Sequence, residues 1–297
     1  MDWKFISLNI IGLGRAEKAR AVRLLRNRKK PQMMFLQETK VTEFSNVLLR
    51  RLGVIQNQKI AFSPSVGSAG GILSVWDTNF FSVVEIYTLR NFVAVLGNIQ
   101  NYEKVVGFLN VYGPSTEAEK REFFRELSVF LGSHNATWCV GGDFNAFLFV
   151  EEKIGYSWNM ASTNLFRTFI QNTQLADLHL NGEAFTWSNN KEPPTFIRLD
   201  RFLVSHDFLA KFPCLNQNIL AKSISDHNPI SLENDGVNWG AKPFKLYNYL
   251  MEEERFVDLV TTAMSKPNSR RTKQGLFGKL KGLKGDIKTW SLDKRGT

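Results

Sequence analysis

Oxygen-bearing side chains stand at the ends of short apolar runs at several points of this 297-residue chain. Asn9, Glu38, Asp143 and Asn145 follow such runs, and Asp226 with its neighbour His227 comes just before the run that begins at Pro229. Carboxylate and amide oxygens are the ligands that Mg²⁺ and Mn²⁺ prefer, and a histidine titrates near neutral pH. Because loops at strand ends can converge on one place, the pattern favours a divalent-cation site with a proton-transfer group beside it.

Each of these motifs has a simpler interpretation when it is taken singly. Asn9 could be a turn residue at a strand end, and Glu38 could be a solvated loop carboxylate. The GDFN segment at 142–145 also fits a turn in which Asp and Asn bond their own backbone, and a lone histidine is more often structural than catalytic. The signal therefore lies in the whole set.

Hydrophobic periodicity indicates the elements that would position these side chains. Strands are expected at residues 4–10, 33–37, 71–76, 81–88, 92–99, 104–112 and 138–140, with short runs at 185–188, 197–204 and 229–232. Helices are expected at residues 17–30, from 116 onward and near 163–172. Strands and helices are intermixed without regular alternation, which favours an α/β or α+β arrangement of sheet layers covered by helices.

The net charge of +10 is distributed unevenly along the chain. Residues 1–239 carry 25 Lys and Arg against 22 Asp and Glu, whereas residues 240–297 carry 13 against 6. We therefore expect a catalytic domain at 1–235 and a basic tail at 236–297 that could add salt-dependent affinity for nucleic acid. The tail has apolar residues at heptad-like spacing from Leu276 to Trp290, but its glycines predict a marginal helix or a flexible segment.

The cysteine content and the terminal segments bound the class of protein further. Cys139 and Cys214 lie far apart without CxxC spacing, which supports neither a disulfide framework nor a zinc cluster and predicts two reduced core thiols. The sequence contains no run of about 18 uncharged apolar residues and no secretory signal pattern at its start. A soluble intracellular protein is expected.

Four segments, in order and spacing, resemble the motifs of the endonuclease/exonuclease/phosphatase superfamily. They are LQETK at 36–40, GDFN at 142–145, RLDRFL at 198–203 and SDHNPI at 225–230, and Asn9 and Tyr112 fit the two remaining family positions. The resemblance covers about residues 3–233 and implies a four-layered α/β sandwich of two packed mixed β-sheets flanked by helices. The FTWSN segment at 185–189 looks similar to the endonucleases of plant LINE (non-LTR) retrotransposons. The tail from Lys242 looks similar to the segment that precedes their reverse transcriptase.

The resemblance implies a role for each matching residue. Glu38, Asn9 and Asp226 would hold Mg²⁺, with Mn²⁺ as a possible substitute, and Asp143 and Asn145 would position the attacking water or a second metal. The remaining roles fall on His227 with its partner Asp200, on Tyr112 as a phosphate ligand, and on Lys40 and Arg198 as contacts to nucleic-acid phosphates. The family is read with either Asp143 or His227 as the proton acceptor, and shared roles are favoured.

The leading functional hypothesis is a metal-dependent phosphodiesterase that nicks DNA, with DNA as its partner, no membrane partner and a nuclear location if the LINE-like role holds. The alternatives are an abasic-site repair nuclease or a phosphatase on the same fold, and a nucleic-acid-binding relic without catalysis. Leu8 and Ile11 depart from the Trp and Arg that plant LINE enzymes often carry around the first Asn. This departure removes no expected metal ligand.

Overall fold

The computed structural model describes residues 2–67, 69–155, 160–222, 224–235, 254–265, 280 and 282–287. The chain divides into two compact units, Met1–Asn238 and Trp239–Thr297. The first unit contains both large sheets, and the second contains helix α7 (Glu254–Ser265) and a helical segment at residues 282–287. All the predicted site residues lie in the first unit.

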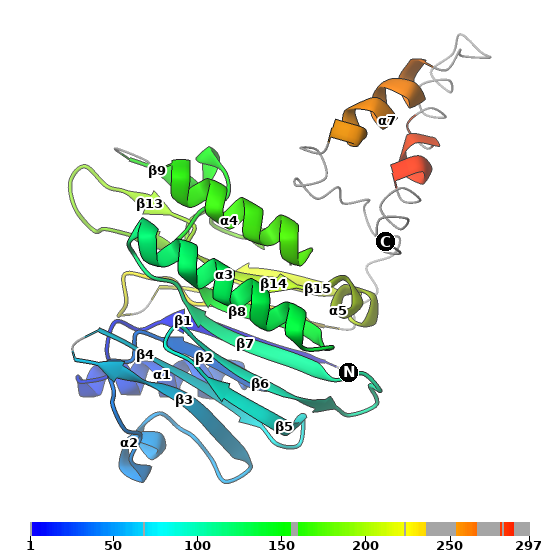
Figure 1. The fold of residues 1–297 in the computed structure, drawn as a ribbon. Helices are drawn as coiled ribbons and strands as arrows, with labels where there is room; N and C mark the ends of the chain where they lie inside the picture. Colours follow the sequence, from blue (N-terminus) through cyan, green and yellow to red (C-terminus); the bar gives the residue numbers. More distant parts are fainter. Residues whose placement is uncertain are drawn as a thin grey trace. The chain divides into compact units, whose positions relative to one another are not determined.

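A mixed sheet of seven strands forms one half of the first unit (Figure 1). Its strands lie in the order β11 (Leu180–Asn181), β15 (Leu215–Ile219), β16 (Ile230–Asn234), β1 (Trp3–Asn9), β2 (Met33–Gln37), β4 (Ala69–Asp77) and β3 (Gln58–Val66). β1 runs parallel to β2 and antiparallel to β16. The carboxyl ends of β1 and β2 therefore meet at one edge of this sheet, where Asn9 pairs with Gln37 in register.

A second mixed sheet of six strands packs on the first. Its order is β10 (Ala176–Asp177), β14 (Asp200–Val204), β8 (Thr137–Asp143), β7 (Val106–Tyr112), β6 (Phe92–Ile99) and β5 (Phe81–Thr88). β7 and β8 are parallel and pair Tyr112 with Asp143, while β8 and β14 are antiparallel and pair Asp143 with Asp200. A small sheet of β12 (Trp187–Ser188), β13 (Phe196–Ile197) and β9 (Lys153–Ile154) lies apart from both.

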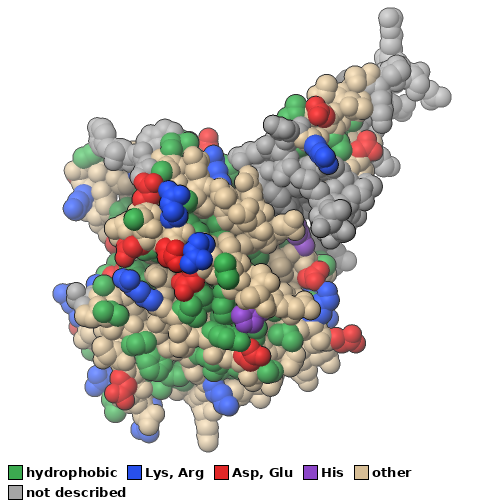
Figure 2. Space-filling model, in the orientation of Figure 1, with side chains coloured by type: hydrophobic (Ala, Val, Ile, Leu, Met, Phe, Trp, Pro, Cys, Tyr) green, Lys and Arg blue, Asp and Glu red, His purple; other side chains and the backbone are tan. Residues whose placement is uncertain are grey.

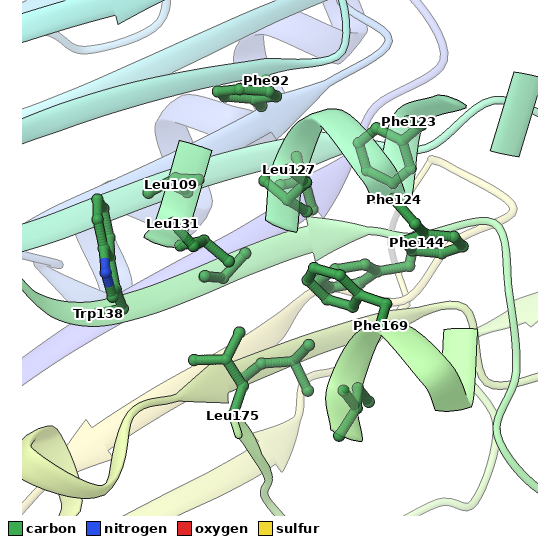
Figure 3. Packing of buried hydrophobic residues seen from close by; sticks show 14 of the residues in the cluster. Phe92, Leu109, Phe123, Phe124, Leu127, Leu131, Trp138, Phe144, Phe169 and Leu175 are labelled. Atoms are coloured by element: carbon green, nitrogen blue, oxygen red, sulfur yellow. The ribbon is translucent and has the colours of Figure 1, made fainter. Parts of the chain in front are cut away.

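Helices cover the outer face of each large sheet (Figure 1). α1 (Ala16–Lys29) and the chain around α2 (Asn46–Arg51) pack on outward side chains of β1, β2 and β4, among them Ile6, Met34 and Leu73. α3 (Glu117–Ser133) and α4 (Met160–Thr173) cover the six-stranded sheet, and a short α5 (His206–Lys211) follows β14. Figure 3 shows the apolar side chains of α3 and α4 meeting those of β6 to β8.

The space between the sheets is filled mainly by aromatic rings. Alternation along β1 turns Phe5 inward, where its ring lies 5.1 Å from that of Phe108 on β7, and the rings of Phe35 and Phe202 lie 6.2 Å apart. Polar contacts also cross this layer: Gln37 Nε2 on β2 donates to Asn110 Oδ1 on β7 at 2.6 Å, and Asn110 Nδ2 donates to the carbonyl of Leu73 on β4 at 3.0 Å. The helix–sheet–sheet–helix order confirms the predicted four-layered sandwich.

Several elements differ from the sequence-based predictions. β3, α2 and β15 were not predicted, and the run at 197–204 is divided between β13 and β14, which belong to different sheets. In the tail, residues 282–287 are helical, whereas Leu276 and Trp290 of the predicted pattern lie outside the described residues. Both cysteines are free, but only Cys139 is buried, so the prediction of a core thiol is wrong for the partly exposed Cys214. Among the described residues, no helix has the length and apolar character needed to cross a membrane.

Candidate active site

The site lies at one edge of the sandwich, where strand ends from both sheets meet. Asn9 ends β1 and Asp143 ends β8, and Asn9 Nδ2 donates to Asp143 Oδ2 at 2.9 Å across the two sheets. Asp143 Oδ1 accepts the backbone N–H of Asn145 at 2.8 Å, and Asn145 Nδ2 donates to the carbonyl of Gly113 at 2.7 Å. The structure thus brings these three predicted residues together.

A glycine allows Asp143 to reach this position. Gly142 has a φ of +147°, and a Cβ there would lie 2.0 Å from the carbonyl oxygen of Val111 on the neighbouring β7. A larger residue would push β8 away from β7 at the point where Asp143 enters the site. The Gly-Asp pair of the GDFN segment is therefore required by packing as well as by chemistry.

His227 connects the two buried carboxylates of the six-stranded sheet. Its Nδ1 lies 2.8 Å from Asp200 Oδ2, and its Nε2 lies 3.8 Å from Asp143 Oδ2. Burial alone would lower the pKa of His227, but the charges of Asp200 and Asp143 outweigh it and raise the pKa to about 9. Burial raises the pKa of Asp143 to about 6, against the opposing charge of His227. The cluster therefore holds a proton near neutral pH.

Asp226 has one oxygen bonded and one left open. Its Oδ2 accepts the indole N–H of Trp187 at 3.0 Å, while its Oδ1 is buried, lies 3.9 Å from His227 Nε2 and has no hydrogen-bond partner among the described residues. Asp200 Oδ1 is also buried and has no hydrogen-bond partner among the described residues. An unpartnered buried carboxylate oxygen is costly, so these two atoms mark where a cation or a donor would be stabilised.

Glu38, Lys40 and Tyr112 form the other side of the site. Lys40 Nζ lies 3.0 Å from Glu38 Oε1, and both side chains are partly exposed. Burial raises the pKa of Tyr112 first, and the charges of Glu38 and Asp143 together with a hydrogen bond to Glu38 raise it further. Tyr112 therefore keeps its proton and can donate it to an anion. Glu38 and Asp143 lie on the same side of the molecule, since both act on one phenol.

The backbone around the site is held in an uncommon conformation. Four residues other than glycine have left-handed φ values: Ile11 at 51°, Glu38 at 51°, Lys40 at 55° and Asn145 at 49°. Such conformations cost about 1–3 kcal/mol each and persist only where surrounding contacts impose them. Lys18 supplies one such contact, because its Nζ donates to the carbonyls of Ile10 and Ile11 at 2.7 and 2.6 Å.

Supporting residues that sequence reasoning missed hold the predicted ones in place. Thr186 Oγ1 accepts the backbone N–H groups of Leu199 and Asp200, both at 3.0 Å. Ser225 Oγ donates to the carbonyl of Asn9 at 2.6 Å and accepts the N–H of His227 at 3.2 Å. Thr186, Trp187 and Ser225 all lie within or beside the quoted motifs, and that proximity was the available signal.

Arg198 does not fulfil its predicted role as a phosphate contact. Its side chain is buried, with one terminal nitrogen 3.0 Å from Glu152 Oε1 and the other 2.9 Å from both Asp177 Oδ1 and the carbonyl of Leu178. The guanidinium is thus held inside the protein, so the phosphate-contact prediction for Arg198 is wrong. Lys40 keeps an exposed ammonium beside Glu38, and its contact with phosphate remains a prediction.

Among the described residues, one group of acidic and histidine side chains lies close enough to hold a metal ion. Asp143, Asp200 and His227 each offer one ligand atom, all within 4.8 Å of one another. In that set, Nδ1 of His227 is engaged by Asp200 and the imidazole favours its protonated form, which has no free lone pair. The set predicted from the resemblance, Asn9, Glu38 and Asp226, offers only oxygen ligands, as Mg²⁺ prefers, and remains a prediction.

Comparison with known proteins places this geometry in a family. The family described as Endonuclease/Exonuclease/phosphatase family matches residues 6–227, which include every predicted site residue. The chain belongs to the endonuclease/exonuclease/phosphatase family. Within this family, the fold is similar to that of an AP endonuclease, LMAP, from Leishmania major, with a TM-score of 0.64, 17% identity, and 79% of this chain and 88% of that chain covered.

Two further proteins are similar to this endonuclease/exonuclease/phosphatase chain. The endonuclease domain of TRAS1, a telomere-specific non-LTR retrotransposon, has a TM-score of 0.59 at 15% identity, with 79% of this chain and 99% of that chain covered. An uncharacterized 149 kDa protein of transposon TX1 from Xenopus laevis is 27% identical over 136 residues, which are 43% of this chain and 10% of that protein. The match thus spans about a tenth of that relative's length.

Proposed function

We propose that the protein is a metal-dependent phosphodiesterase that nicks DNA. The observation that carries the proposal is the meeting of Asn9, Asp143, Asp200 and His227 from two sheets in one hydrogen-bonded cluster. The structural relatives support a nucleic-acid substrate, since they include an AP endonuclease and a retrotransposon endonuclease domain. They also include a 3′ phosphatase, NExo, from Neisseria, which is 18% identical to this chain with a TM-score of 0.61 and whose structure contains a product DNA hairpin.

The described residues fit a divalent cation such as Mg²⁺ or Mn²⁺. Asp226 Oδ1 is a buried carboxylate oxygen without a partner, and it belongs to the all-oxygen set with Asn9 and Glu38. We propose that these three residues hold the ion, while Asp143 and Asn145 position the attacking water or a second ion. When bound, the ion would neutralise negative charge on the phosphate as the bond to the leaving oxygen breaks.

The protein's own groups would handle the protons. Asp200 holds His227 at Nδ1, and the raised pKa of His227 favours the imidazolium form. The Nε2 atom of this imidazolium lies 3.8 Å from Asp143 Oδ2. Asp143, whose pKa is raised towards neutrality, would accept the proton of the attacking water at a carboxylate oxygen. The imidazolium and the Tyr112 hydroxyl would donate to the phosphate oxygens as charge accumulates there. Lys40 would add a contact to a neighbouring phosphate.

Nicking of supercoiled plasmid tests the proposal. The wild type should nick plasmid in Mg²⁺ or Mn²⁺ but not in EDTA, and Glu38→Ala, Asp143→Ala and His227→Ala should each abolish nicking. Asp207→Ala is a matched control, because it removes an exposed carboxylate on α5, paired with Lys104, outside the site. DNA binding without nicking in either metal would overturn the proposal and leave the binding relic.

The likeness to an AP endonuclease keeps an abasic-site nuclease as a second candidate. An oligonucleotide with a single abasic site, an intact oligonucleotide and an inositol phosphate separate the reactions. Cleavage restricted to the abasic site would support the second candidate, whereas release of phosphate from the inositol phosphate alone would indicate a phosphatase. We expect cleavage of intact DNA as well.

We further propose that residues 1–235 are the catalytic domain and that residues 236–297 form a basic extension that adds affinity for nucleic acid. A retrotransposon-type endonuclease acts on chromosomal DNA, so a nuclear location goes with this proposal. Removal of the tail should weaken DNA binding and reduce its salt dependence while leaving the metal requirement of nicking unchanged.

A further inference from the structure

The charge of the first unit is concentrated in one stretch of its sequence. Residues 15–59 carry 12 Lys and Arg against 3 Asp and Glu, a net charge of +9, whereas residues 60–239 carry 12 against 18, a net charge of −6. The near balance of the whole unit therefore conceals a strong separation. The basic stretch contains α1, β2, α2 and the start of β3.

Folding places this charge on the outer layer over the seven-stranded sheet. Helix α1 turns Ala19, Val22 and Arg26 inward, and its Arg20, Arg23 and Arg28 are exposed. We call their exposed set, with the end of α2, the cationic face; it consists of Arg15, Arg20, Arg23, Arg28, Lys30, Arg50 and Arg51. Because α1 starts directly after the loop that follows Asn9, this face begins beside the site and extends away from it along the helix.

No carboxylate among the residues that the structure describes forms an ion pair with the cationic face. Among the described residues, none of its seven members forms an ion pair, whereas on the opposite layer Arg125 pairs with Glu122. Figure 2 presents the α3–α4 side of the first unit, where basic and acidic side chains are interspersed. Like charges three or four residues apart destabilise a helix by roughly 0.2–0.5 kcal/mol each, so α1 carries a cost that a polyanion would relieve.

A buried side chain joins the two helices that carry the cationic face. Arg26 is buried and donates to Gln58 Oε1 and, at 3.4 Å, to the carbonyl of Gly53, so it ties α1 to the chain that follows α2. The side chain of Arg23 packs on Gly53, where a Cβ would lie 3.0 Å from its Cγ. Arg23 and Arg51 are thus presented by one rigid layer rather than by separate loops.

We propose that the cationic face is a second nucleic-acid-binding surface. It binds the phosphate backbone of duplex DNA at a distance from the bond that is cut. Six of its seven members are arginine, whose planar fork of donors matches phosphate oxygens. α1 is about 21 Å long, the length of roughly six base pairs. A lipid surface fits less well, because Leu24 and Val47 are the large apolar side chains that the two helices expose among the described residues. The surface shares its partner with the proposed function but does not require catalysis.

Salt-dependent binding of duplex DNA by the full chain in EDTA tests the surface. The variant Arg20→Gln, Arg23→Gln, Arg28→Gln removes three charges from the cationic face. For each phosphate that is no longer neutralised, the slope of log K against log salt should fall by about 0.9, and binding should weaken roughly 8-fold at about 0.1 M salt. The weakening should be the same for duplexes of different sequence, because backbone contacts carry no sequence information.

A matched control separates local contacts from net charge. Lys104→Gln, Arg121→Gln, Arg125→Gln removes three charges from the side of the six-stranded sheet and should leave the slope almost unchanged. Equal slopes for the wild type and the α1 variant, with equal melting temperatures, would overturn the proposal. So would binding of the wild type's cationic face to anionic vesicles or polyglutamate but not to duplex DNA. Because no metal is present, loss of nicking and loss of this surface are observed independently.

Discussion

Adjacent residues of β14 enter two buried clusters of opposite character. Asp200 faces the site cluster, defined by Asp143, Asp200, Asp226 and His227, whereas Arg201 faces the other side of the strand. Arg201 belongs to a paired cluster with Arg198, Glu152 and Asp177. Both clusters carry several ionisable groups with little access to solvent, so burial alone does not distinguish them.

The two clusters differ in whether their positive and negative charges balance. In the paired cluster, two guanidinium groups meet two carboxylates, and Arg201 contacts both Glu152 oxygens and Asp177 Oδ2. In the site cluster, carboxylates outnumber the histidine and two of their oxygens have no partner among the described residues. In the paired cluster the two positive charges balance the two negative charges without a ligand, although the Nε atoms of Arg198 and Arg201 are buried without partners among the described residues. The site cluster is instead left with excess negative charge that a cation can balance. A buried charged cluster therefore indicates function only when its own partners fail to balance it.

The largest expected effect is on catalysis at the site cluster. Asp143→Asn keeps the size of the side chain but removes the proposed proton acceptor, so nicking should fall by about 10³-fold or more. The free energy of unfolding should change by less than about 1 kcal/mol, because loss of a hydrogen-bond acceptor is offset by removal of a buried charge. Plasmid nicking and urea unfolding of the metal-free protein measure the two effects. A loss of several kcal/mol would show that this cluster is also structural.

The opposite pattern is expected at the paired cluster. Arg201→Met leaves Glu152 and Asp177 short of a cation, and the free energy of unfolding should fall by about 3–5 kcal/mol. Nicking per folded molecule should fall by much less than in Asp143→Asn. Arg125→Met, which breaks an exposed pair with Glu122, is the control and should cost less than about 1 kcal/mol. A variant of Arg201 that is as stable as the wild type would remove the contrast between the clusters.

A smaller effect should appear in acid. Burial alone would raise the pKa of Glu152, but the charges of Arg201 and Arg198 and its hydrogen bonds lower the pKa to about 2 from an ordinary 4.5. Because the folded-state pKa is the lower one, Glu152 stabilises the protein above about pH 4.5, and this contribution of roughly 3 kcal/mol is lost as the pH falls towards 2. The stability gap between the wild type and Glu152→Gln should therefore narrow between pH 5 and pH 3 in urea unfolding, whereas a constant gap would contradict the pairing.

Much of the fold could be predicted from sequence because buried elements leave a periodic signal, whereas the site residues were predicted from ordered motifs that resemble the family. The central strands β1, β2, β6 and β7 are buried and were predicted, whereas β3 is an edge strand that contains Pro64 and alternates between buried and exposed positions. α2 has six residues and buries none of them, so it offers no apolar stripe. β3 and α2 were missed for this physical reason, whereas the edge strand β5 was predicted from its β-branched and aromatic residues.

Arg198 shows where residue type alone is insufficient. An arginine next to a catalytic motif is an ordinary candidate for a phosphate contact, yet its partners Asp177 and Glu152 lie 21 and 46 residues away in the sequence. Only the fold brings Glu152 to it, because the carbonyl of Glu152, the last residue of η1 (Val150–Glu152), accepts the backbone N–H of Arg198. The same limit applies to Trp187, whose bond to Asp226 depends on the pairing of Trp187 with His227.

The hydrogen bond between Gln37 and Asn110 has a consequence for how well the site is aligned. Asn9 and Glu38 are carried by one sheet and Asp143 and Asp200 by the other, so a sliding movement between the sheets would separate Asn9 from Asp143. Rings that pack face to edge resist such shear weakly, whereas an amide held at 2.6 Å resists it through direction as well as distance. Buried polar groups that touch no reacting atom, Gln37 and Asn110 with the carbonyl of Leu73, thus help to hold the two sheets in the alignment that the site needs.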